Sequence, residues 1–568
     1  MNRSVRVLWL CCLLWQGAFA AAGPFDVIIR GGMVYDGTGG PPVRADVAVQ
    51  GDRIAGIGDF DAAAARREID AAGMAVAPGF INMLSWATDA LVADGRSQSD
   101  IRQGVTLEVF GEGISYGPVN DRLRALLKAR QSDIRYDIEW STLGGYLDYL
   151  ERRGISPNVA SFVGATTLRI HEVGLEDRAA TPEELARMQD QVRQAMREGA
   201  LGVGSSLIYA PAFYADTAEL VALATAAGEF GGMYISHLRS EGNRLLESID
   251  ELIHIAERAG VPAEIYHLKM SGEANWPKLD AAIARIEAAR ARGLRITANM
   301  YTYTAGSTGL DAAMPPAVQA GGYEAWRARL QDADVRARVL TEMRTPTDDW
   351  ENLLLAAGAE GTLLVGFRNP ALRRYAGRTL ADVAAERGTS PEEAAIDLVV
   401  EDGSRVQVVY FLMSEDNVRR QVALPWMSFG SDAASMAPEG VFLLRSTHPR
   451  AYGNFARLLG RYVREQQAMS LSRAVHQLTL LPATNLGLRG RGSLTPGHFA
   501  DVVVFDPARI QDHATYDDPH RYATGVRHVL VNGVPVLEDG EHTGALPGRV
   551  VRGPGWSGWP CCEEGAAP

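Results

Sequence analysis

Hydrophobic residues at the two ends of the chain form short β-branched runs. From residue 25 to residue 58 these runs are separated by Gly, Asp and Pro, which is typical of a small antiparallel β unit. The same pattern returns only at 498–506 and 526–540, where an Asn-Gly pair at 532 is a strong hairpin signal. We therefore predict one β domain that both chain ends build together.

Between these ends, short apolar runs alternate with amphipathic helices. Such alternation is expected of repeated βα units around a parallel sheet. The clearest helix follows Thr181, which can cap it, and Pro182 suits its first position. Eight runs are suited to the strands of a barrel, at 80–86, 104–110, 158–164, 201–207, 232–237, 262–267, 294–301 and 427–432.

The predicted fold class is α/β, a TIM-like (β/α)8 barrel with a small β-sandwich formed by both chain ends. We place the barrel at 80–479 and the composite sandwich at 23–79 and 480–556. The stretch 306–415 is mostly helical or irregular by pattern, without a regular strand–helix rhythm. It is interpreted as an insertion before the last barrel strand.

The first residues have the features of a secretory signal. Arg3 and Arg6 flank the start of an apolar run at 7–14 that ends in small residues. We predict a signal peptide over 1–22 and a periplasmic or secreted mature protein. No later segment reaches the roughly 18 apolar residues that a membrane span needs, so no stable membrane insertion is expected after signal removal. A tail is predicted at 557–568.

Composition narrows the possible functions. Hydrophobic residues make up 46% and charged residues 22%, the balance of a globular protein with a sizeable core. The 56 Lys and Arg against 69 Asp and Glu give a net charge of -13 without a long basic run, so nucleic acid is not an expected partner. The four cysteines, Cys11, Cys12, Cys561 and Cys562, lack the spacing of a zinc ribbon or redox motif.

Polar residues that close the predicted barrel strands are the candidates for chemistry, because barrel active sites form at these ends. His237 and His267 end consecutive strands, Asp432 ends the last strand, and Glu112 follows the strand GVTLEVF. A lone histidine at a strand end is more often structural. Two histidines with an acid nearby favour a metal site, because imidazole and carboxylate are suitable Zn²⁺ ligands.

A series of sequence blocks supports a family assignment, namely DVIIRGGMVYDGTG, APGFIN, GVTLEV, GALGVGSSLIYAPAFYA, YISHLRSEG, YHLKMSG, YTYTAGST, GSDAAS, HPRAYGNFARLLGRYVRE, ADVVVFDP and VNGVPV. With these blocks in this order, nearly all of the sequence after the predicted signal resembles the D-aminoacylase (N-acyl-D-amino-acid deacylase) branch of the amidohydrolase superfamily. The resemblance implies a barrel flanked by a β-sandwich made from both chain ends.

The resemblance also implies roles for individual residues. His237 and His267 match the metal-binding histidines, and Asp432 matches the acid that serves as general base and then proton donor. Three further residues match substrate contacts, namely Lys269, Tyr301 and Arg450. Arg450 is the best candidate to bind a substrate carboxylate, because guanidinium donates two parallel hydrogen bonds.

Two departures from the family pattern bear on the metal. Amidohydrolases usually carry HxH on the first strand, but the segment PGFINMLSWATDA places Leu84 and Trp86 there, and neither binds zinc. The family's usual Cys is also absent; Glu112 of GEG stands near its place if one residue is deleted, and it is favoured over Glu108, which lies within the strand. We therefore expect one zinc per chain, held by Glu112, His237 and His267.

These observations predict a metal-dependent amide hydrolase that deacylates N-acyl-D-amino acids. Zinc would lower the pKa of bound water from about 15.7 toward about 7, and Asp432 would move the proton. The expected partner is a small N-acyl amino acid or related amide, and the D configuration rests on the resemblance alone. Two alternatives stay open: a hydrolase of another linear or cyclic amide, and an inactive binding protein in which Leu84 and Trp86 fill the former metal position with apolar bulk.

Overall fold

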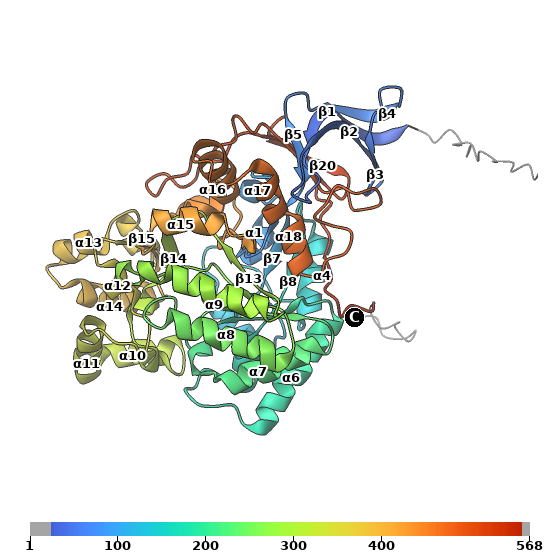
Figure 1. The fold of residues 1–568 in the computed structure, drawn as a ribbon. Coiled ribbons are helices and arrows are strands. Elements are labelled where there is room, and N and C mark those ends of the chain that lie inside the picture. Colours follow the sequence, from blue (N-terminus) through green and yellow to red (C-terminus); the bar gives the residue numbers. More distant parts are fainter. Residues whose placement is uncertain (1–23, 559–568) are drawn as a thin grey trace, which may run out of the picture.

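The computed structural model describes residues 24–558 as a barrel with attached elements on two sides (Figure 1). The predicted signal peptide, all four cysteines and the tail from residue 559 lie outside the described residues. Among residues 24–558, no helix has the length and apolarity that crossing a membrane requires.

The centre of the molecule is a parallel barrel. Its strands are β6 (Phe80–Asn82), β7 (Val105–Phe110), β8 (Asn158–Ser161), β9 (Val163–Gly164), β10 (Gly202–Ser206), β11 (Met233–His237), β12 (Ala263–Ile265), β13 (Ile296–Met300) and β17 (Met427–Phe429). The Met83 N–H donates to the Phe429 carbonyl over 3.1 Å, and Ser85 pairs with Ala433 in a parallel β-bridge. The first and last strands of the barrel therefore meet. Each of the eight predicted runs contains a strand, and the barrel prediction is confirmed.

Helices cover the outside of this barrel. α6 (Pro182–Arg197) begins as its sequence predicts, because Thr181 and Glu184 satisfy each other's backbone N–H groups and Pro182 occupies the first turn. Its apolar face is buried against the barrel. The other helices outside the insertion are α1 (Thr88–Ala93), α2 (Gln98–Ile101), α3 (Asp121–Arg130), α4 (Leu143–Arg153), α5 (Ala165–Glu172), α7 (Thr217–Gly228), α8 (Leu245–Ala259), α9 (Leu279–Ala291), α15 (Glu415–Val422), α16 (Arg450–Arg457), α17 (Leu471–Leu478) and α18 (Leu480–Asn485).

Strands from both chain ends join in one nine-stranded sheet, ordered β21-β20-β19-β18-β5-β1-β2-β3 with β4 beside β1. They are β1 (Phe25–Val34), β2 (Val43–Gln50), β3 (Arg53–Gly58), β4 (Ala65–Asp70), β5 (Ala75–Pro78), β18 (Val502–Phe505), β19 (Val526–Val531), β20 (Val534–Glu538) and β21 (Glu541–His542). β5 pairs antiparallel with β18, which unites the two ends. The predicted hairpin joins β19 to β20, with φ of 49° at Asn532 and 79° at Gly533.

The insertion contains a sheet that the sequence pattern did not indicate. β14 (Ala305–Gly309), β16 (Gln407–Phe411) and β15 (Thr362–Gly366) form three antiparallel strands. The segment is mostly helical or irregular, as expected, but the sequence pattern did not indicate its strands. β14 reads AGSTG without apolar alternation and pairs with a strand about a hundred residues later. The insertion's helices are α10 (Tyr323–Gln331), α11 (Ala333–Arg344), α12 (Leu353–Ala357), α13 (Leu380–Arg387) and α14 (Pro391–Asp402).

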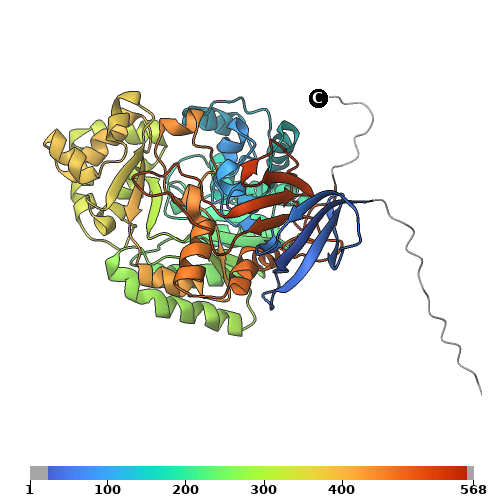
Figure 2. The same ribbon diagram turned by 90° about the horizontal axis from the view of Figure 1, so that it is seen from above.

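The insertion and the nine-stranded sheet lie on opposite sides of the barrel. In both views the insertion projects at the left and the nine-stranded sheet lies at the right (Figures 1 and 2). The final described segment instead follows the barrel: the Val551 N–H donates to the Val159 carbonyl, and the Gly553 N–H donates to the Gly199 carbonyl, each over 2.8 Å. These contacts lie near the starts of β8 and β10, away from the strand ends that carry the candidate site.

Candidate metal centre and active site

The predicted site residues come together at the carboxyl ends of the barrel strands. His237 is the last residue of β11, and Glu112, His267 and Asp432 follow β7, β12 and β17 within a few residues. The turn before Glu112 requires glycine, because Gly111 has φ of 109° and a Cβ there would lie 2.4 Å from the Phe162 carbonyl oxygen. Parallel strands thus deliver side chains far apart in sequence to one edge.

Three buried side chains form a group that could bind a metal ion. Glu112 Oε1 lies 2.8 Å from His267 Nε2 and 3.1 Å from His237 Nδ1, and the two ring nitrogens lie 3.0 Å apart. One donor atom from each residue lies within 4.8 Å of the others. Two imidazole nitrogens and one carboxylate oxygen are a suitable donor set for Zn²⁺. The side chains therefore fit the metal that the sequence predicts.

In this group the carboxylates and the imidazoles stabilise each other's charged forms. Burial alone would raise the pKa of Glu112, but the two imidazoles hold it well below its usual range. Burial and Lys269 lower the pKa of His267, but the carboxylates of Glu241 and Glu112 outweigh them and raise it to about 9. The pocket therefore favours positive charge between the carboxylates, which also favours a bound cation.

Glu241 is a site residue that the sequence reasoning missed. Its Oε1 accepts a hydrogen bond from Lys269 Nζ over 2.6 Å and lies 3.0 Å from His267 Nδ1, and its Oε2 lies 3.5 Å from His237 Nε2. Glu241 thus contacts the sides of both rings that face away from Glu112. The available signal was an acid four residues after His237 in SHLRSEG, on the same strand-end loop.

We expect Glu241→Gln to weaken zinc binding by roughly 10- to 100-fold, because carboxylates behind metal-binding histidines orient the rings and raise their basicity. The zinc dissociation constant, measured by competition with a chelator, checks this. Glu247→Gln is the control, because Glu247 is an exposed acid on neighbouring α8. Equal zinc affinity in the two variants would contradict the role of Glu241.

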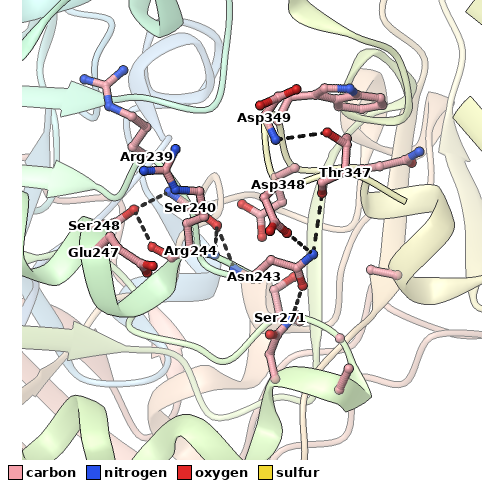
Figure 3. Close-up of a pocket in the computed structure, with 18 of the residues that line it drawn as sticks. Arg239, Ser240, Asn243, Arg244, Glu247, Ser248, Ser271, Thr347, Asp348 and Asp349 are labelled. Atoms are coloured by element: carbon pink, nitrogen blue, oxygen red, sulfur yellow. Dashed lines mark hydrogen bonds between the residues drawn. The ribbon is translucent and has the colours of Figure 1, made fainter. Parts of the chain in front are cut away.

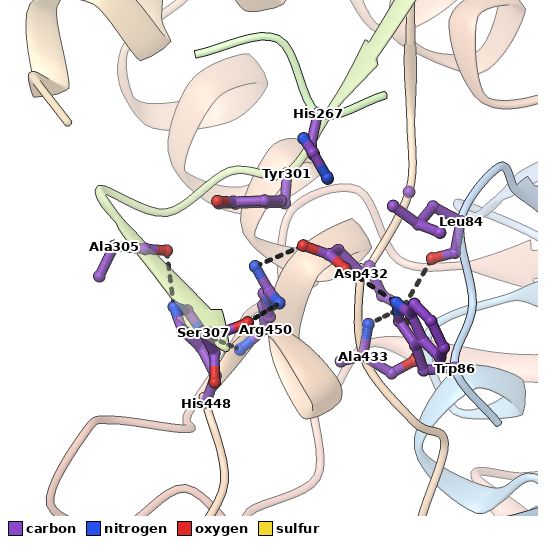
Figure 4. Close-up of polar contacts among 12 residues, drawn as sticks. Leu84, Trp86, His267, Tyr301, Ala305, Ser307, Asp432, Ala433, His448 and Arg450 are labelled. Carbon is purple, nitrogen blue, oxygen red and sulfur yellow. Dashed lines mark hydrogen bonds and ion pairs between the residues drawn. The ribbon is translucent and has the colours of Figure 1, made fainter. Parts of the chain in front are cut away.

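Asp432 lies in a second group next to the metal donors (Figure 4). Its Oδ2 forms an ion pair with Arg450 Nη1 at 2.9 Å, and its Oδ1 accepts a hydrogen bond from Trp86 Nε1 over 3.1 Å. Burial raises the pKa of Asp432, the charge of Glu112 adds to this effect, and Arg450 opposes it. The predicted proton-transfer acid is therefore close to both the metal donors and the predicted carboxylate binder.

Leu84 and Trp86 stand where the family usually has the two histidines of HxH, and their side chains make different contacts. Leu84 is 1% exposed and packs in a buried apolar cluster inside the barrel. The indole Nε1 of Trp86 faces the candidate site: besides its bond to Asp432, it donates to Glu112 Oε2 over 3.1 Å. Trp86 also packs against the cluster that contains Leu84, so both side chains bring apolar bulk to this position, but the indole N–H adds hydrogen bonds to two carboxylates.

The predicted substrate contacts surround one aromatic ring. Arg450 Cζ lies 4.4 Å and Lys269 Nζ lies 5.6 Å from the centroid of Tyr301. His448 supports Arg450, because its Nδ1 accepts the Arg450 backbone N–H over 3.0 Å. The structure thus brings all seven predicted residues into one region, namely Glu112, His237, His267, Lys269, Tyr301, Asp432 and Arg450, while their individual roles stay predictions.

Figure 3 shows a cavity that the loop after β11 shares with the insertion. It has a volume of about 970 Å³ and is lined by the loop after β11, the start of α8 and an insertion segment that includes Asp348 and Asp349. None of the seven predicted residues lines it. Its wall includes Glu351, whose Oε2 accepts the Glu241 backbone N–H over 3.0 Å. This cavity is therefore separate from the place where the metal-donor atoms converge.

Comparison with known proteins agrees with this geometry. The model of the amidohydrolase family matches residues 136–537. D-aminoacylase of Alcaligenes xylosoxydans xylosoxydans is 35% identical over 530 residues, which cover 93% of this chain and 98% of that protein. The chain belongs to the D-aminoacylase branch of the amidohydrolase family.

Solved structures of this amidohydrolase branch share the fold over the same length. A D-aminoacylase structure, described with a binuclear metal centre in which one metal activates and the second attenuates, is 33% identical with a TM-score of 0.78. N-acyl-D-glutamate deacylase from Bordetella bronchiseptica, solved with zinc and a phosphonate inhibitor, is 32% identical with a TM-score of 0.77. Each match covers 93% of this chain and 100% of the other.

Proposed function

We propose that this protein hydrolyses the amide bond of N-acyl-D-amino acids, producing a carboxylate and a free D-amino acid. The observation that carries the proposal is the arrangement of three groups in one site: a three-residue metal-donor set, and the ion pair of a carboxylate with a guanidinium, which Trp86 links to that set by hydrogen bonds. Relatives named as D-aminoacylase and N-acyl-D-glutamate deacylase support the substrate class and its configuration.

One zinc ion per chain is the proposed cofactor. Glu112, His237 and His267 would hold it, and it would supply Lewis-acid polarisation of the scissile carbonyl and a lowered pKa for water. A second ion is not part of the proposal, because Leu84 and Trp86 offer no ligand atom where the family usually has histidines.

Asp432 is placed to move the proton that hydrolysis requires. As a carboxylate it can accept a proton from the attacking water and return it to the leaving nitrogen, the two-way role of a single acid–base group. Its pairing with Arg450 keeps Oδ2 occupied before substrate binds. A substrate carboxylate that competes for the guanidinium would release this oxygen for proton transfer.

Arg450 is the proposed binding group for the substrate carboxylate. Its Nε is buried without a hydrogen-bond partner, and its side chain is 3% exposed. A buried, unpartnered donor on a guanidinium favours an anionic ligand, because leaving it unsatisfied costs free energy. Tyr301, against whose ring the guanidinium lies, holds its orientation.

The test compares N-acetyl-D-amino acids with N-acetylated amines that lack the carboxylate. We expect the wild type to prefer the amino acids by kcat/KM, and Arg450→Ala to lose roughly 30-fold or more of that preference, as for a charge-assisted bidentate contact. N-acetyl-L-amino acids serve as the stereochemical control. A wild type that hydrolyses both compound classes equally would contradict the assignment and favour another amide as substrate.

We also propose that the protein is exported to the periplasm or secreted. The basic residues and apolar run within 1–22 support this proposal. Mass spectrometry of the protein recovered from each cell fraction tests it. An N-terminus at residue 1 on a cytoplasmic protein would contradict it.

A further inference from the structure

Trp86 donates a hydrogen bond to a carboxylate in each of two parts of the site, the metal-donor set and the Asp432–Arg450 pair. Its Nε1 lies 3.1 Å from Glu112 Oε2 and 3.1 Å from Asp432 Oδ1. Each carboxylate uses its second oxygen elsewhere, because Glu112 Oε1 faces the histidines and Asp432 Oδ2 faces Arg450. One indole N–H thus links the metal-donor set to the Asp432–Arg450 pair.

The backbone around Trp86 is held on both sides. The Trp86 N–H donates to the Ala433 carbonyl over 2.9 Å, and the Asp432 N–H donates to the Leu84 carbonyl over 2.8 Å. The Ser85 N–H donates to the Val109 carbonyl over 2.8 Å, which ties the same segment to β7. The segment that carries the indole is therefore bonded directly to the segments that carry Glu112 and Asp432.

The two carboxylates would repel each other without a donor between them. An N–H shared by both offsets part of that repulsion, and it does so without adding a charge. Glu112 consequently keeps its full negative charge for a cation on its other oxygen. A preorganised donor of this kind needs no rearrangement when the reaction proceeds.

We propose that Trp86 is a positioning residue whose indole N–H orients Glu112 for a single metal ion and Asp432 for proton transfer. The inference rests on the proposed function and adds to it a residue at the position where the family usually has a histidine. It also explains why Trp86 can stand where the family usually has a histidine: the indole supplies a neutral hydrogen-bond donor in place of a metal ligand.

A space-filling role alone does not account for this contact. Trp326 and Trp426 are buried tryptophans whose Nε1 atoms have no hydrogen-bond partner, so this fold accepts an indole without one. Trp86 differs because its N–H meets two acceptors that both belong to the candidate site. The same substitution at Trp86 and at Trp326 therefore separates positioning from filling.

The experiment compares Trp86→Phe with Trp326→Phe in the mature protein. Trp326 lies on α10 of the insertion, within a separate core cluster. For Trp86→Phe we expect kcat to fall by roughly 10- to 100-fold with KM changed by less than about threefold, and the zinc dissociation constant to rise by about tenfold. Trp326→Phe should match the wild type in all three quantities.

A Trp86→Phe variant that equals Trp326→Phe in both kcat and zinc affinity would overturn the inference. Should the phenylalanine variant fail to fold, β-(3-benzothienyl)alanine at position 86 replaces the N–H by sulfur in nearly the same shape, with the same expected losses. The zinc measurement separates this inference from the proposed function. A wild type that binds zinc but cleaves no N-acyl-D-amino acid refutes the substrate alone, whereas a wild type that binds no zinc refutes both.

Discussion

The His237→Ala/His267→Ala variant is expected to bind no stoichiometric zinc and to lose at least about 10⁴-fold of its amide hydrolysis. The two rings supply two of the three donor atoms that lie within 4.8 Å of one another. Glu112 alone does not form a zinc site, because such sites use three or four protein ligands. Metal per chain by elemental analysis and hydrolysis of an N-acetyl-D-amino acid are measured on the same samples.

The matched control for this variant is His254→Ala. His254 is an exposed histidine on α8, outside the candidate site. It should keep about one zinc and wild-type activity. Retained zinc in the double variant would contradict the assigned ligands. A folded wild type that is metal-free, inactive and still binds a ligand would instead support the binding-protein alternative.

The Asp432→Asn variant is expected to retain zinc and lose roughly 10²- to 10⁴-fold in kcat, the usual contribution of a positioned acid–base group. Asparagine keeps the size of the side chain and an oxygen that can accept the Trp86 N–H, but it loses the basicity that proton transfer needs. Single-turnover rates and zinc content, measured together, check the expectation. A variant within about threefold of the wild-type kcat would refute this role.

Asp432→Asn also removes the ion pair with Arg450, so a second variant is needed to separate the two effects. Arg450→Ala breaks the same pair and leaves the Asp432 carboxylate in place. On an acetylated amine without a carboxylate, we expect Arg450→Ala to keep most of its kcat and Asp432→Asn to lose it. Equal losses in both variants would assign the effect to the broken pair and not to proton transfer.

Local patterns in the sequence determined the architecture. Eight apolar runs predicted the barrel strands, and β-branched runs at both chain ends predicted the sheet that they share. These signals are readable because strand pairing buries apolar side chains at regular intervals. β14, with the sequence AGSTG, escaped detection because its position in a sheet is decided by its partner and not by its own residues.

The sequence also determined which residue types stand at the strand ends, and the resemblance attached expected roles to His237, His267 and Asp432. Their common location follows from barrel topology, since every parallel strand ends at the same edge. The replacement of the HxH histidines by Leu84 and Trp86 was likewise visible in the sequence.

Only the tertiary structure decided how these side chains contact one another. The position of Glu241 behind both histidines, the Asp432–Arg450 pair and the Trp86 N–H between two carboxylates depend on where loops from different strands meet. Trp86 and Asp432 are 346 positions apart along the chain. Contacts over such separations are set by closure of the barrel and by hydrogen-bond geometry, because neither leaves a periodic pattern in the residues nearby.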